Sequence, residues 1–291
     1  MSRKNILFII NPVSGLGRQK KVEKLVKEEL DHRQFAHEFV MTKARKHATE
    51  LARKAAEEGF DAVAAIGGDG TVNEVGTGLK GSKTALAILP CGSGNGAARH
   101  MKIPVDLEKA MQVINRFNVT AIDTFSLNQY TVVNTAGIGY AAHIAHVFSR
   151  LKKRGFSNYL KIAIRDSVGY RSQQCEVEYN GKKQSIHAFI IDIANGSQWG
   201  NNARIAPHAV NNDGLLDLCM VRDFPYRNFP IMATRLFLGS IDRSRYVEIA
   251  QVKEAFIRQE HTYAHIDGEP EEIGHELRIK IEPLSLRVIA P

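Results

Sequence analysis

Short aliphatic runs that alternate with amphipathic segments are the strongest constraint on how this chain can fold. The runs at 6–10, 61–66 and 85–89 are almost wholly aliphatic, which predicts strands buried on both faces. Apolar residues recur at helical spacing over 22–30, 47–58, 71–79 and 106–116, and 35–41 reads as a further strand. This alternation predicts a parallel sheet with helices on both faces, whose ligands lie at the carboxyl ends of the strands.

The second half of the chain has a different pattern of predicted elements. After Asp123, β-rich stretches follow one another at 130–135, 175–179, 186–194, 215–221, 247–252, 263–266 and 277–281, with helical spacing at 141–151 and 229–237. We therefore predict an α/β fold of two domains. A doubly wound parallel-sheet domain spans 1–125, and a β-rich antiparallel domain spans 126–283. The last run, 284–289, fits either domain by its periodicity.

Composition places the chain among soluble globular proteins. Of its 291 residues, 44% are hydrophobic and 24% are charged, and its apolar runs stay below the roughly 18 residues that a membrane span needs. Cys91, Cys175 and Cys219 are too few and too far apart for a disulfide framework, so we expect a cytoplasmic protein. The formal net charge of +8 allows attraction to anionic membranes, nucleic acids or phosphorylated small molecules without choosing among them.

Two glycine-rich clusters follow the buried runs. Residues 67–74 read Gly-Gly-Asp-Gly-Thr-Val-Asn-Glu, and three glycines in four positions let the backbone approach a phosphate closely. Within this cluster, Asp69 and Thr71 could serve a metal and a phosphate. Residues 90–96, Pro-Cys-Gly-Ser-Gly-Asn-Gly, offer backbone donors and Ser93 for a second phosphate contact. The second cluster fits neither the dinucleotide-binding nor the Walker pattern.

Two further clusters are less specific on their own. Residues 11–18, Asn-Pro-Val-Ser-Gly-Leu-Gly-Arg, fit either an anion site or an ordinary strand-to-helix turn. The tripeptide Asp267-Gly268-Glu269 also fits an ordinary turn. Two carboxylates at this spacing could instead divide the work, one near a metal and the other accepting a proton.

Together, in this order and at this spacing, the four clusters resemble the diacylglycerol kinase catalytic-domain family. That family includes bacterial soluble lipid kinases, sphingosine kinases and ceramide kinases, and the resemblance covers nearly the whole chain. It implies an N-terminal nucleotide-binding domain and a C-terminal lipid-binding domain, with 284–291 returning to the first domain. It also implies ATP and Mg²⁺ as cofactors.

The resemblance implies roles for individual residues. Those that match nucleotide contacts of the family are Asn11, Pro12, Ser14, Gly15, Thr42, Gly67, Gly68, Asp69, Gly70, Thr71, Asn73, Gly92, Ser93 and Asn95. Glu269 matches the proton acceptor of the bacterial enzymes. Asp69, Asp123 and Asp267 match acidic residues that organise catalytic Mg²⁺. Sphingosine kinases are usually described with the equivalent of Asp69 as the base, so Asp69 is the alternative to Glu269.

The resemblance also implies a structural Mg²⁺ site in the second domain. Residues 195–215 resemble a family stretch that holds Mg²⁺ through one carboxylate and two backbone carbonyls. The matching positions are Asp213 for the carboxylate, with Val210 and Leu215 for the carbonyls. Oxygen ligands suit Mg²⁺. A simple Asn-Asp-Gly turn over 212–214 is the alternative.

These features favour an ATP- and Mg²⁺-dependent lipid kinase that phosphorylates a primary hydroxyl of a lipid such as diacylglycerol. Kinases for sphingoid bases commonly carry an acidic side chain shortly after the turn that 137–139 resembles. This chain continues Tyr140-Ala141-Ala142-His143, which favours a neutral lipid alcohol. The alternatives are a sphingoid-base or ceramide kinase, a nicotinamide nucleotide kinase, which shares the Gly-Gly-Asp-Gly turn, and a non-catalytic nucleotide- or lipid-binding regulator.

The expected partners are a lipid substrate and, through peripheral association, an anionic membrane surface. The basic run 150–154, Arg-Leu-Lys-Lys-Arg, could contact lipid headgroups, although a charged helix end is the commoner meaning of such a run. We expect no nucleic-acid partner, and a homodimer stays open. His143 and His146 stand at helical spacing without an acidic partner, and His261 and His265 fit surface or strand positions, so none is assigned a metal.

Overall fold

The chain forms two compact units, each with its own core. The computed structural model describes residues 3–14, 18, 21–151 and 156–291. The first unit comprises Met1–Ile122 with Leu284–Pro291, and the second comprises Asp123–Pro283. The boundary therefore follows Ile122, inside the strand β5 (Val119–Leu127), a few residues before the predicted one. None of the helices in the described ranges is both long and apolar enough to cross a membrane.

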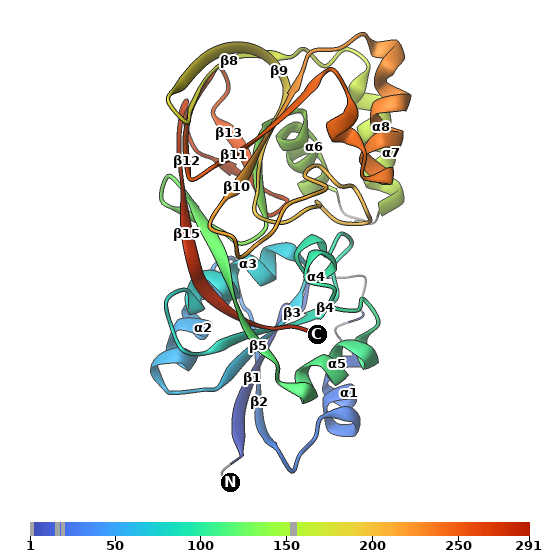
Figure 1. The fold of residues 1–291 in the computed structure, drawn as a ribbon. Helices are drawn as coiled ribbons and strands as arrows, with labels where there is room; N and C mark the ends of the chain where they lie inside the picture. Colours follow the sequence, from blue (N-terminus) through green and yellow to red (C-terminus); the bar gives the residue numbers. More distant parts are fainter. Residues whose placement is uncertain (1–2, 15–17, 19–20, 152–155) are drawn as a thin grey trace. The chain divides into compact units, whose positions relative to one another are not determined.

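The first unit is built on a parallel sheet in the order β4-β3-β1-β2, which confirms the predicted α/β fold (Figure 1). Its register pairs Ile6 of β1 with Ala62 of β3, and Ala62 with Ala85 of β4. All residues of β3 and β4 are buried, which is why their sequences are continuously apolar rather than alternating. The strands are β1 (Lys4–Ile10), β2 (Phe35–Met41), β3 (Ala62–Gly67) and β4 (Ala85–Pro90).

Helices connect these strands as the apolar spacing predicts. The Asp106 carboxylate caps the last of them by accepting from the Lys109 N–H at 3.0 Å, so the chain turns into a helix at this acidic residue. A short helix after β4 was not predicted, because five residues are too few to show a period. The helices are α1 (Val22–Glu29), α2 (His47–Glu57), α3 (Asp69–Leu79), α4 (Gly96–His100) and α5 (Leu107–Arg116).

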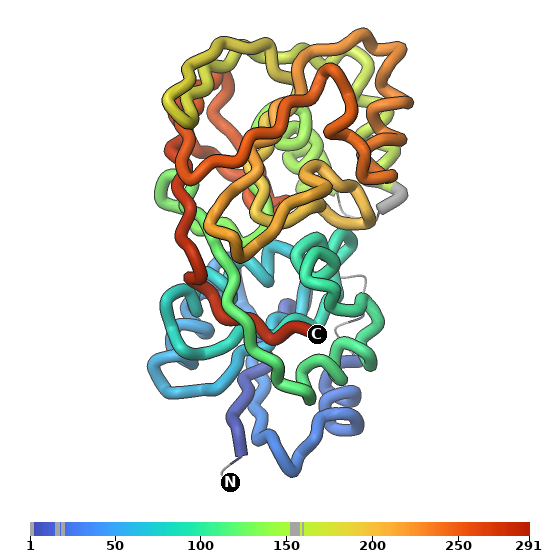
Figure 2. Tube along the Cα trace, in the orientation of Figure 1, coloured from blue at the N-terminus to red at the C-terminus, as the bar shows by residue number. Residues whose placement is uncertain are grey.

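The C-terminal residues belong to the first unit. Strand β15 (Glu276–Ile289) begins in the second unit, and its end pairs in parallel with β4, Val288 lying opposite Leu86. The Ala290 N–H donates to the Asn118 carbonyl at 3.0 Å, which fixes the last residues beside the start of β5 (Figure 2). The two runs predicted at 277–281 and 284–289 are thus one strand.

The second unit is a mostly antiparallel β structure. Its strands run in the order β14-β13-β7-β9-β8-β12-β15, and β10 pairs with β9 and β11. The predicted single strand over 130–135 is wrong, because the chain leaves the sheet between β6 and β7. Besides β5 and β15, the strands are β6 (Tyr130–Val132), β7 (Thr135–Gly139), β8 (Gln173–Tyr179), β9 (Lys182–Ala194), β10 (Leu216–Arg222), β11 (Val247–Val252), β12 (Glu254–Gln259), β13 (Tyr263–Ile266) and β14 (Glu269–Glu272).

Residues of β9 serve two different cores. Ile191 and Ile193 point into a core formed by the strands, whereas Phe189 and Ile190 join an aromatic core with Tyr140. The second core is covered by three helices, α6 (Tyr140–Ser149), α7 (Phe156–Ser167) and α8 (Phe229–Leu238) (Figure 1). Of these, α7 was not predicted. Two short 3₁₀ turns, Tyr226–Asn228 and Ile241–Arg243, flank α8.

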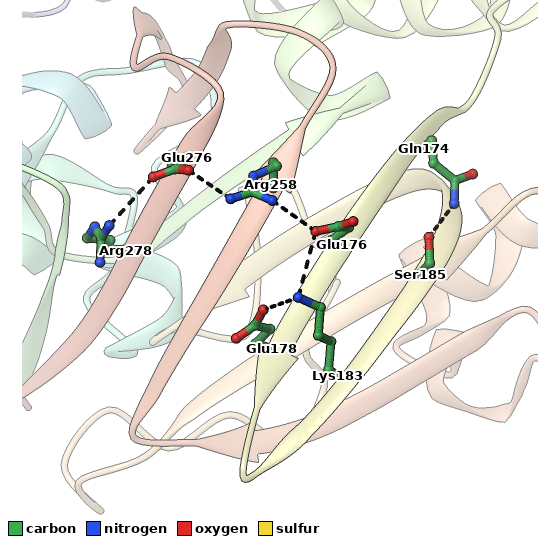
Figure 3. A network of polar contacts seen from close by, with 8 residues as sticks. All are labelled: Gln174, Glu176, Glu178, Lys183, Ser185, Arg258, Glu276 and Arg278. Carbon is green, nitrogen blue, oxygen red and sulfur yellow. Dashed lines mark hydrogen bonds and ion pairs between the residues drawn. The ribbon is translucent and has the colours of Figure 1, made fainter.

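A ladder of charged side chains lies across the outer face of β8, β9, β12 and β15 (Figure 3). Arg258 bridges Glu176 at 3.2 Å and Glu276 at 3.0 Å, and Lys183 pairs with Glu178 at 2.7 Å. These pairs join neighbouring strands on one exposed face, and the Gln174–Ser185 hydrogen bond extends the row. Exposed pairs of this kind stabilise little, so we assign them to register and solubility rather than to function.

Gly78 sets the distance between α2 and α3. A Cβ atom at this position would lie 2.5 Å from the Thr49 carbonyl oxygen and 2.8 Å from the Ala52 Cβ. Alanine normally stabilises a helix by about 1 kcal/mol relative to glycine. We predict the opposite sign here: Gly78→Ala should lower the free energy of unfolding by roughly 1–3 kcal/mol, because the helices must separate. Calorimetry should show a lower melting temperature, and an increase would contradict this account of the packing.

Candidate active site

The predicted nucleotide-binding residues gather at one edge of the first unit's sheet. Asn11 follows β1, Thr42 follows β2, Gly67 ends β3 and Gly92 follows β4. Because these strands are parallel neighbours, their carboxyl ends share one edge. The Thr42 N–H donates to the Ile10 carbonyl at 2.9 Å, which ties the ends of β1 and β2 together. Gly15, also predicted here, lies outside the described residues.

Strand β3 passes into helix α3 through two glycines. Gly68 is the N-cap of α3, with φ of −97°, and the helix begins at Asp69, two residues earlier than its periodicity predicts. The first turn of a helix holds N–H groups that the helix itself does not use, and the helix dipole favours an anion there. Since the N-cap has no side chain, a ligand phosphate can reach these groups. Gly70, Thr71 and Asn73 follow within the first turns.

The two glycine-rich clusters touch each other. A Cβ atom built on Gly92 would lie 2.5 Å from the Gly68 Cα, and one built on Gly68 would lie 3.3 Å from the Gly92 Cα. The backbones of the two clusters are therefore in van der Waals contact. The Cys91 N–H also donates to the Gly67 carbonyl at 2.8 Å, which extends the parallel pairing into the clusters. Glycine is required at Gly92 by the fold as well as by any ligand.

Side chains of the predicted residues hold these loops in shape. The Asn95 amide accepts from the Gly92 N–H at 2.9 Å and donates to the Gly92 carbonyl at 2.8 Å, so it closes its own turn. One oxygen of Asp69 accepts from the Ala97 N–H at 3.2 Å, at the start of α4. The Asn11 side chain donates to the Thr71 hydroxyl at 3.1 Å, which joins the loop after β1 to α3. Pro12, Ser14 and Ser93 lie on the same loops.

In the second unit, Asp267 lies on a tight hairpin turn between β13 and β14. Asp267 and Gly268 have φ angles of 47° and 82°, the left-handed pair that a type I′ turn needs. The Asp267 carboxylate is buried and accepts three backbone N–H groups, from Val133 at 3.0 Å and from Asn134 and Thr135 at 2.9 Å. Both carboxylate oxygens are therefore engaged by the segment that links β6 to β7.

Asn195 connects this segment to Asp123. Its side-chain amide donates to the Asp123 carbonyl at 2.7 Å and to the Val133 carbonyl at 2.8 Å. Asp123 is fully buried, and its carboxylate accepts from the Gly214 N–H at 2.7 Å. The structure thus brings Asp123 and Asp267, both predicted to be catalytic, into one polar network through Asn195. Sequence reasoning did not predict this linking role of Asn195 and the 133–135 segment.

Glu269 begins β14 and lies two residues after Asp267. It pairs with Ile266 across the turn and is half-buried. The turn that the Asp267 carboxylate anchors therefore fixes the backbone of Glu269. Partial exposure leaves this residue accessible to a reactant, whereas Asp123 and Asp267 are buried.

A buried histidine–aspartate pair lies beside this network. His265 Nε2 is 2.9 Å from the Asp192 carboxylate, which also accepts from the Trp199 indole N–H at 2.9 Å. Burial raises the pKa of the Asp192 carboxyl, and the two hydrogen bonds oppose that rise. A side chain at Gly137 would collide with the pair, since its Cβ would lie 2.6 Å from the Asp192 carboxylate. His265 is therefore a buried strand position and not a surface one.

The prediction that His143 has no acidic partner is wrong. Its Nε2 lies 3.1 Å from the Asp166 carboxylate, so it has an acidic partner after all. That partner comes from α7, 23 residues later in the chain, which a search for helical spacing cannot find. The hydrogen bond from Arg165 lowers the pKa of the Asp166 carboxyl. Burial opposes this change, and the hydrogen bond with His143 lowers the pKa further.

The predicted structural Mg²⁺ turn packs directly on Asp123. The Asp123 N–H donates to the Asn211 carbonyl at 2.7 Å, within the same turn that supplies the Gly214 N–H. Asp213 is exposed, and one of its oxygens accepts from the Leu215 N–H at 3.0 Å. Burial, and next the charge of Asp213, raises the pKa of the Asp217 carboxyl to about 6. Among the described residues, His, Cys, Asp and Glu side chains form no group of three that could hold a metal ion.

Comparisons with known proteins match both halves of the chain. A family model described as "Diacylglycerol kinase catalytic domain" matches residues 5–127, and one described as "YegS C-terminal NAD kinase beta sandwich-like domain" matches 134–290. A protein of Chromohalobacter salexigens named "Probable lipid kinase YegS-like" is 30% identical over 249 residues, 83% of this chain and 79% of its own length. The Bacillus subtilis protein named diacylglycerol kinase is 28% identical over 278 residues, 92% of this chain and 90% of its own length.

Solved structures share the fold. A crystal structure of a diacylglycerol kinase from Bacillus anthracis (strain Sterne) matches with a TM-score of 0.76 at 21% identity, covering 100% of this chain and 98% of that one. At this level of identity the match shows the fold alone.

The two glycines of the touching clusters should respond differently to alanine. Gly92→Ala places a methyl group 2.5 Å from backbone, so the clusters must separate and the melting temperature of the protein should fall by several degrees. Gly68→Ala meets backbone only at 3.3 Å, so its melting temperature should stay close to that of the wild type. Circular dichroism during heating compares the two directly. Equal melting temperatures would refute the close-contact explanation.

Asp267→Asn should destabilise the second unit. In the wild type, three N–H groups donate to the two carboxylate oxygens of Asp267. The asparagine side chain has only one acceptor oxygen, so at least one of these buried N–H groups would face its NH₂ group. We expect a loss of about 1–3 kcal/mol in the free energy of unfolding, measured by urea denaturation. Glu272→Gln, an exposed carboxylate on the same hairpin, is the matched control and should change stability little. Unchanged stability of the Asp267 variant would show that the three hydrogen bonds contribute nothing.

Proposed function

Because the chain belongs to the diacylglycerol kinase catalytic-domain family and is a lipid kinase, we propose that it transfers the γ-phosphate of ATP to a primary hydroxyl of a neutral lipid such as diacylglycerol. The observation that carries the proposal is the gathering of four separate sequence segments at the carboxyl edge of the first unit's sheet. Magnesium dependence and the neutral-lipid preference belong to the same proposal.

The phosphates of ATP bind, in this proposal, at the paired glycine clusters. Helix α3 offers N–H groups at Asp69, Gly70 and Thr71, where the helix dipole favours negative charge. The contact between Gly68 and Gly92 brings the second cluster beside this helix end, so Ser93 can add a donor to the same phosphates. Asn11 and Thr42 mark the ends of β1 and β2 on the same edge, and they complete the nucleotide site.

Magnesium would neutralise the charge that develops on the transferred phosphoryl group. The Asp69 carboxylate, beside the glycine clusters, suits it, because carboxylate oxygens are the ligands that Mg²⁺ prefers. A second, structural ion would use the Asp213 carboxylate with the carbonyls of Val210 and Leu215.

Glu269 is the proposed general base. It accepts the proton of the lipid hydroxyl as the hydroxyl oxygen bonds to the γ-phosphorus and the bond to the β-phosphate oxygen breaks, with ADP leaving. Asp69 is less suited to this role, because one of its oxygens already caps α4 through the Ala97 N–H. Asp267 acts as a positioning residue, since both its oxygens are bonded to backbone and its turn fixes Glu269.

The start of α6 supports a neutral substrate. Tyr140, Ala141 and Ala142 follow the Gly139 N-cap and are all buried, so this turn presents no carboxylate to an ammonium group. Asp166, the acid nearest His143, is already paired with His143 and Arg165. A sphingoid base would lack its charge partner at these positions, whereas a diacylglycerol needs none.

Glu269→Gln tests the proposed base. The change keeps the size and hydrogen-bonding capacity of the side chain but removes its basic oxygen. We expect turnover of detergent-dispersed diacylglycerol to fall at least about a hundredfold, with ATP affinity by calorimetry and melting temperature both unchanged. Glu271→Gln, two residues further along β14, is the matched control and should keep turnover within a fewfold of the wild type.

Two outcomes would revise this proposal. Near-normal turnover by the Glu269 variant would remove Glu269 as base and move the role to Asp69. Undiminished ATP affinity in the Gly68→Ala variant, where a methyl group would stand at the phosphate site, would count against phosphate binding at the glycine clusters.

A further inference from the structure

One buried polar pair of the second unit takes no part in the proposed phosphoryl transfer. His265 of β13 is 3% exposed and Asp192 of β9 is fully buried, and His265 Nε2 lies 2.9 Å from Asp192 Oδ2. The Nδ1 atom of the same imidazole has no hydrogen-bond partner among the described residues. The contact with Asp192 is therefore the polar contact that orients the ring.

The pair reaches across an intervening strand. Strand β7 lies between β9 and β13, and its Gly137 is in register with Asp192 on one side and with His265 on the other. Strands two positions apart in a sheet are separated by roughly 9.5 Å, so their side chains meet only by passing over the residue between them. A Cβ atom at Gly137 would lie 2.6 Å from the Asp192 carboxylate and 3.0 Å from His265 Nε2. The glycine therefore makes room for the pair, which connects β13 directly to β9.

The hairpin that carries Glu269 has only a short backbone connection to the sheet. Among the described strands, β14 pairs with β13, and β13 pairs with β7 through His265 and Ile266 alone. Glu269 lies opposite Ile266, and its neighbour Pro270 lies opposite His265. Strand β9, in contrast, pairs with β7, β8 and β10. The histidine thus joins the hairpin, next to Glu269, to a strand that is held by three others.

Stability alone does not account for a polar pair at this place. Taking two polar side chains out of water costs free energy that their hydrogen bond offsets only in part, and apolar side chains of similar volume often stabilise a core as well. A hydrogen bond differs from apolar contact in requiring a particular distance and direction. The pair therefore suits a role in fixing a position rather than a role in stability.

We propose that Asp192 and His265 are positioning residues, which fix the β13–β14 hairpin on β9 and so hold the Glu269 carboxylate in place for the lipid hydroxyl. This inference rests on the proposed function, in which Glu269 is the base. The Asp267 carboxylate fixes the turn of the hairpin, whereas His265 fixes its first strand. Without the second contact the hairpin is free to pivot about its turn, and a misplacement of about 1 Å lowers a reaction rate by up to about a hundredfold.

Trp199 provides a matched control on the same carboxylate. Its indole N–H donates to Asp192 Oδ2 at 2.9 Å, the same oxygen and the same distance as for His265. Trp199 lies on the loop after β9 and not on the hairpin. Trp199→Phe therefore takes one hydrogen bond from Asp192 but leaves the connection to β13. An effect on the hairpin is expected from His265 variants and not from this one.

The first test is hydrogen exchange of the backbone amides of the hairpin. His265→Asn carries an amide too short to reach Asp192 from β13, whereas the amide of His265→Gln, one CH₂ longer, replaces Nε2. We expect exchange over residues 263–272 to rise about tenfold or more in His265→Asn and to stay within about threefold of the wild type in His265→Gln and Trp199→Phe. His265→Leu is a second variant without the hydrogen bond and should behave as His265→Asn does.

The second test is turnover of detergent-dispersed diacylglycerol. His265→Asn should lower kcat about tenfold or more and leave the KM for ATP within about twofold, and His265→Gln should recover most of the loss. In a Glu269→Gln background, the same His265→Asn change should lower the residual turnover less than about twofold, because no base is left to position. A merely structural role of His265 would lower turnover by the same factor in both backgrounds.

Two results would overturn the inference. One is hairpin exchange in His265→Asn and His265→Leu that equals the exchange in Trp199→Phe. The other is an equal loss of turnover with and without Glu269. The two tests also separate this inference from the proposed function. A wild type that phosphorylates no dispersed lipid, while exchange rises in the His265 variants alone, refutes the proposed activity and supports the fixing of the hairpin. An active wild type whose His265 variants show unchanged exchange refutes the positioning role alone.

Discussion

Three backbone N–H groups converge on the Asp267 carboxylate, and the arrangement of the second unit around its acidic residues depends on this contact. The carboxylate interrupts the sheet between β6 and β7, holds the tight turn at Asp267-Gly268 and so places Glu269 at the start of β14. Asn195 extends the network to Asp123. A buried charge without partners would be costly, but three N–H donors satisfy this one. A residue predicted to bind metal therefore has a structural reason to be an aspartate.

The first unit depends on a different interaction, the van der Waals contact between the backbones of the loops after β3 and β4. Gly68 and Gly92 allow the loops after β3 and β4 to meet, and Asn95 and Asp69 then lock those loops with side-chain hydrogen bonds. The same glycines leave the start of α3 uncovered for an anion. One set of residues thus serves both the fold and the proposed phosphate site, which explains why the cluster is so dense in glycine.

The sequence was most informative where a pattern is local. Continuous apolar runs identified β3 and β4, and helical spacing over 106–116 identified α5. The break between β6 and β7 escaped prediction, because it is imposed by a carboxylate more than 130 residues away in the chain. His265 lies on a strand, which is one of the two positions that its prediction allowed. Its burial and its partner Asp192 depend on strand pairing through Gly137 and could not be predicted from the sequence.

Resemblance to a family supplied the candidate site residues that no local pattern could select, such as Asp123 and Asp213. The structure adds the burial of the acidic residues: Glu269 is half-buried, whereas Asp123 and Asp267 are buried. This difference in burial is why Glu269, rather than its neighbours, is the proposed base.

The central claim is that this chain moves the γ-phosphate of ATP to the hydroxyl of a neutral lipid. It is tested most directly by incubating the purified protein with γ-labelled ATP, Mg²⁺ and a panel of dispersed acceptors that includes diacylglycerol, ceramide, a sphingoid base and a nicotinamide nucleotide. Our account predicts label in the lipid fraction, highest with diacylglycerol and absent without Mg²⁺. Label in the nicotinamide nucleotide alone, or in none of the acceptors, would contradict it.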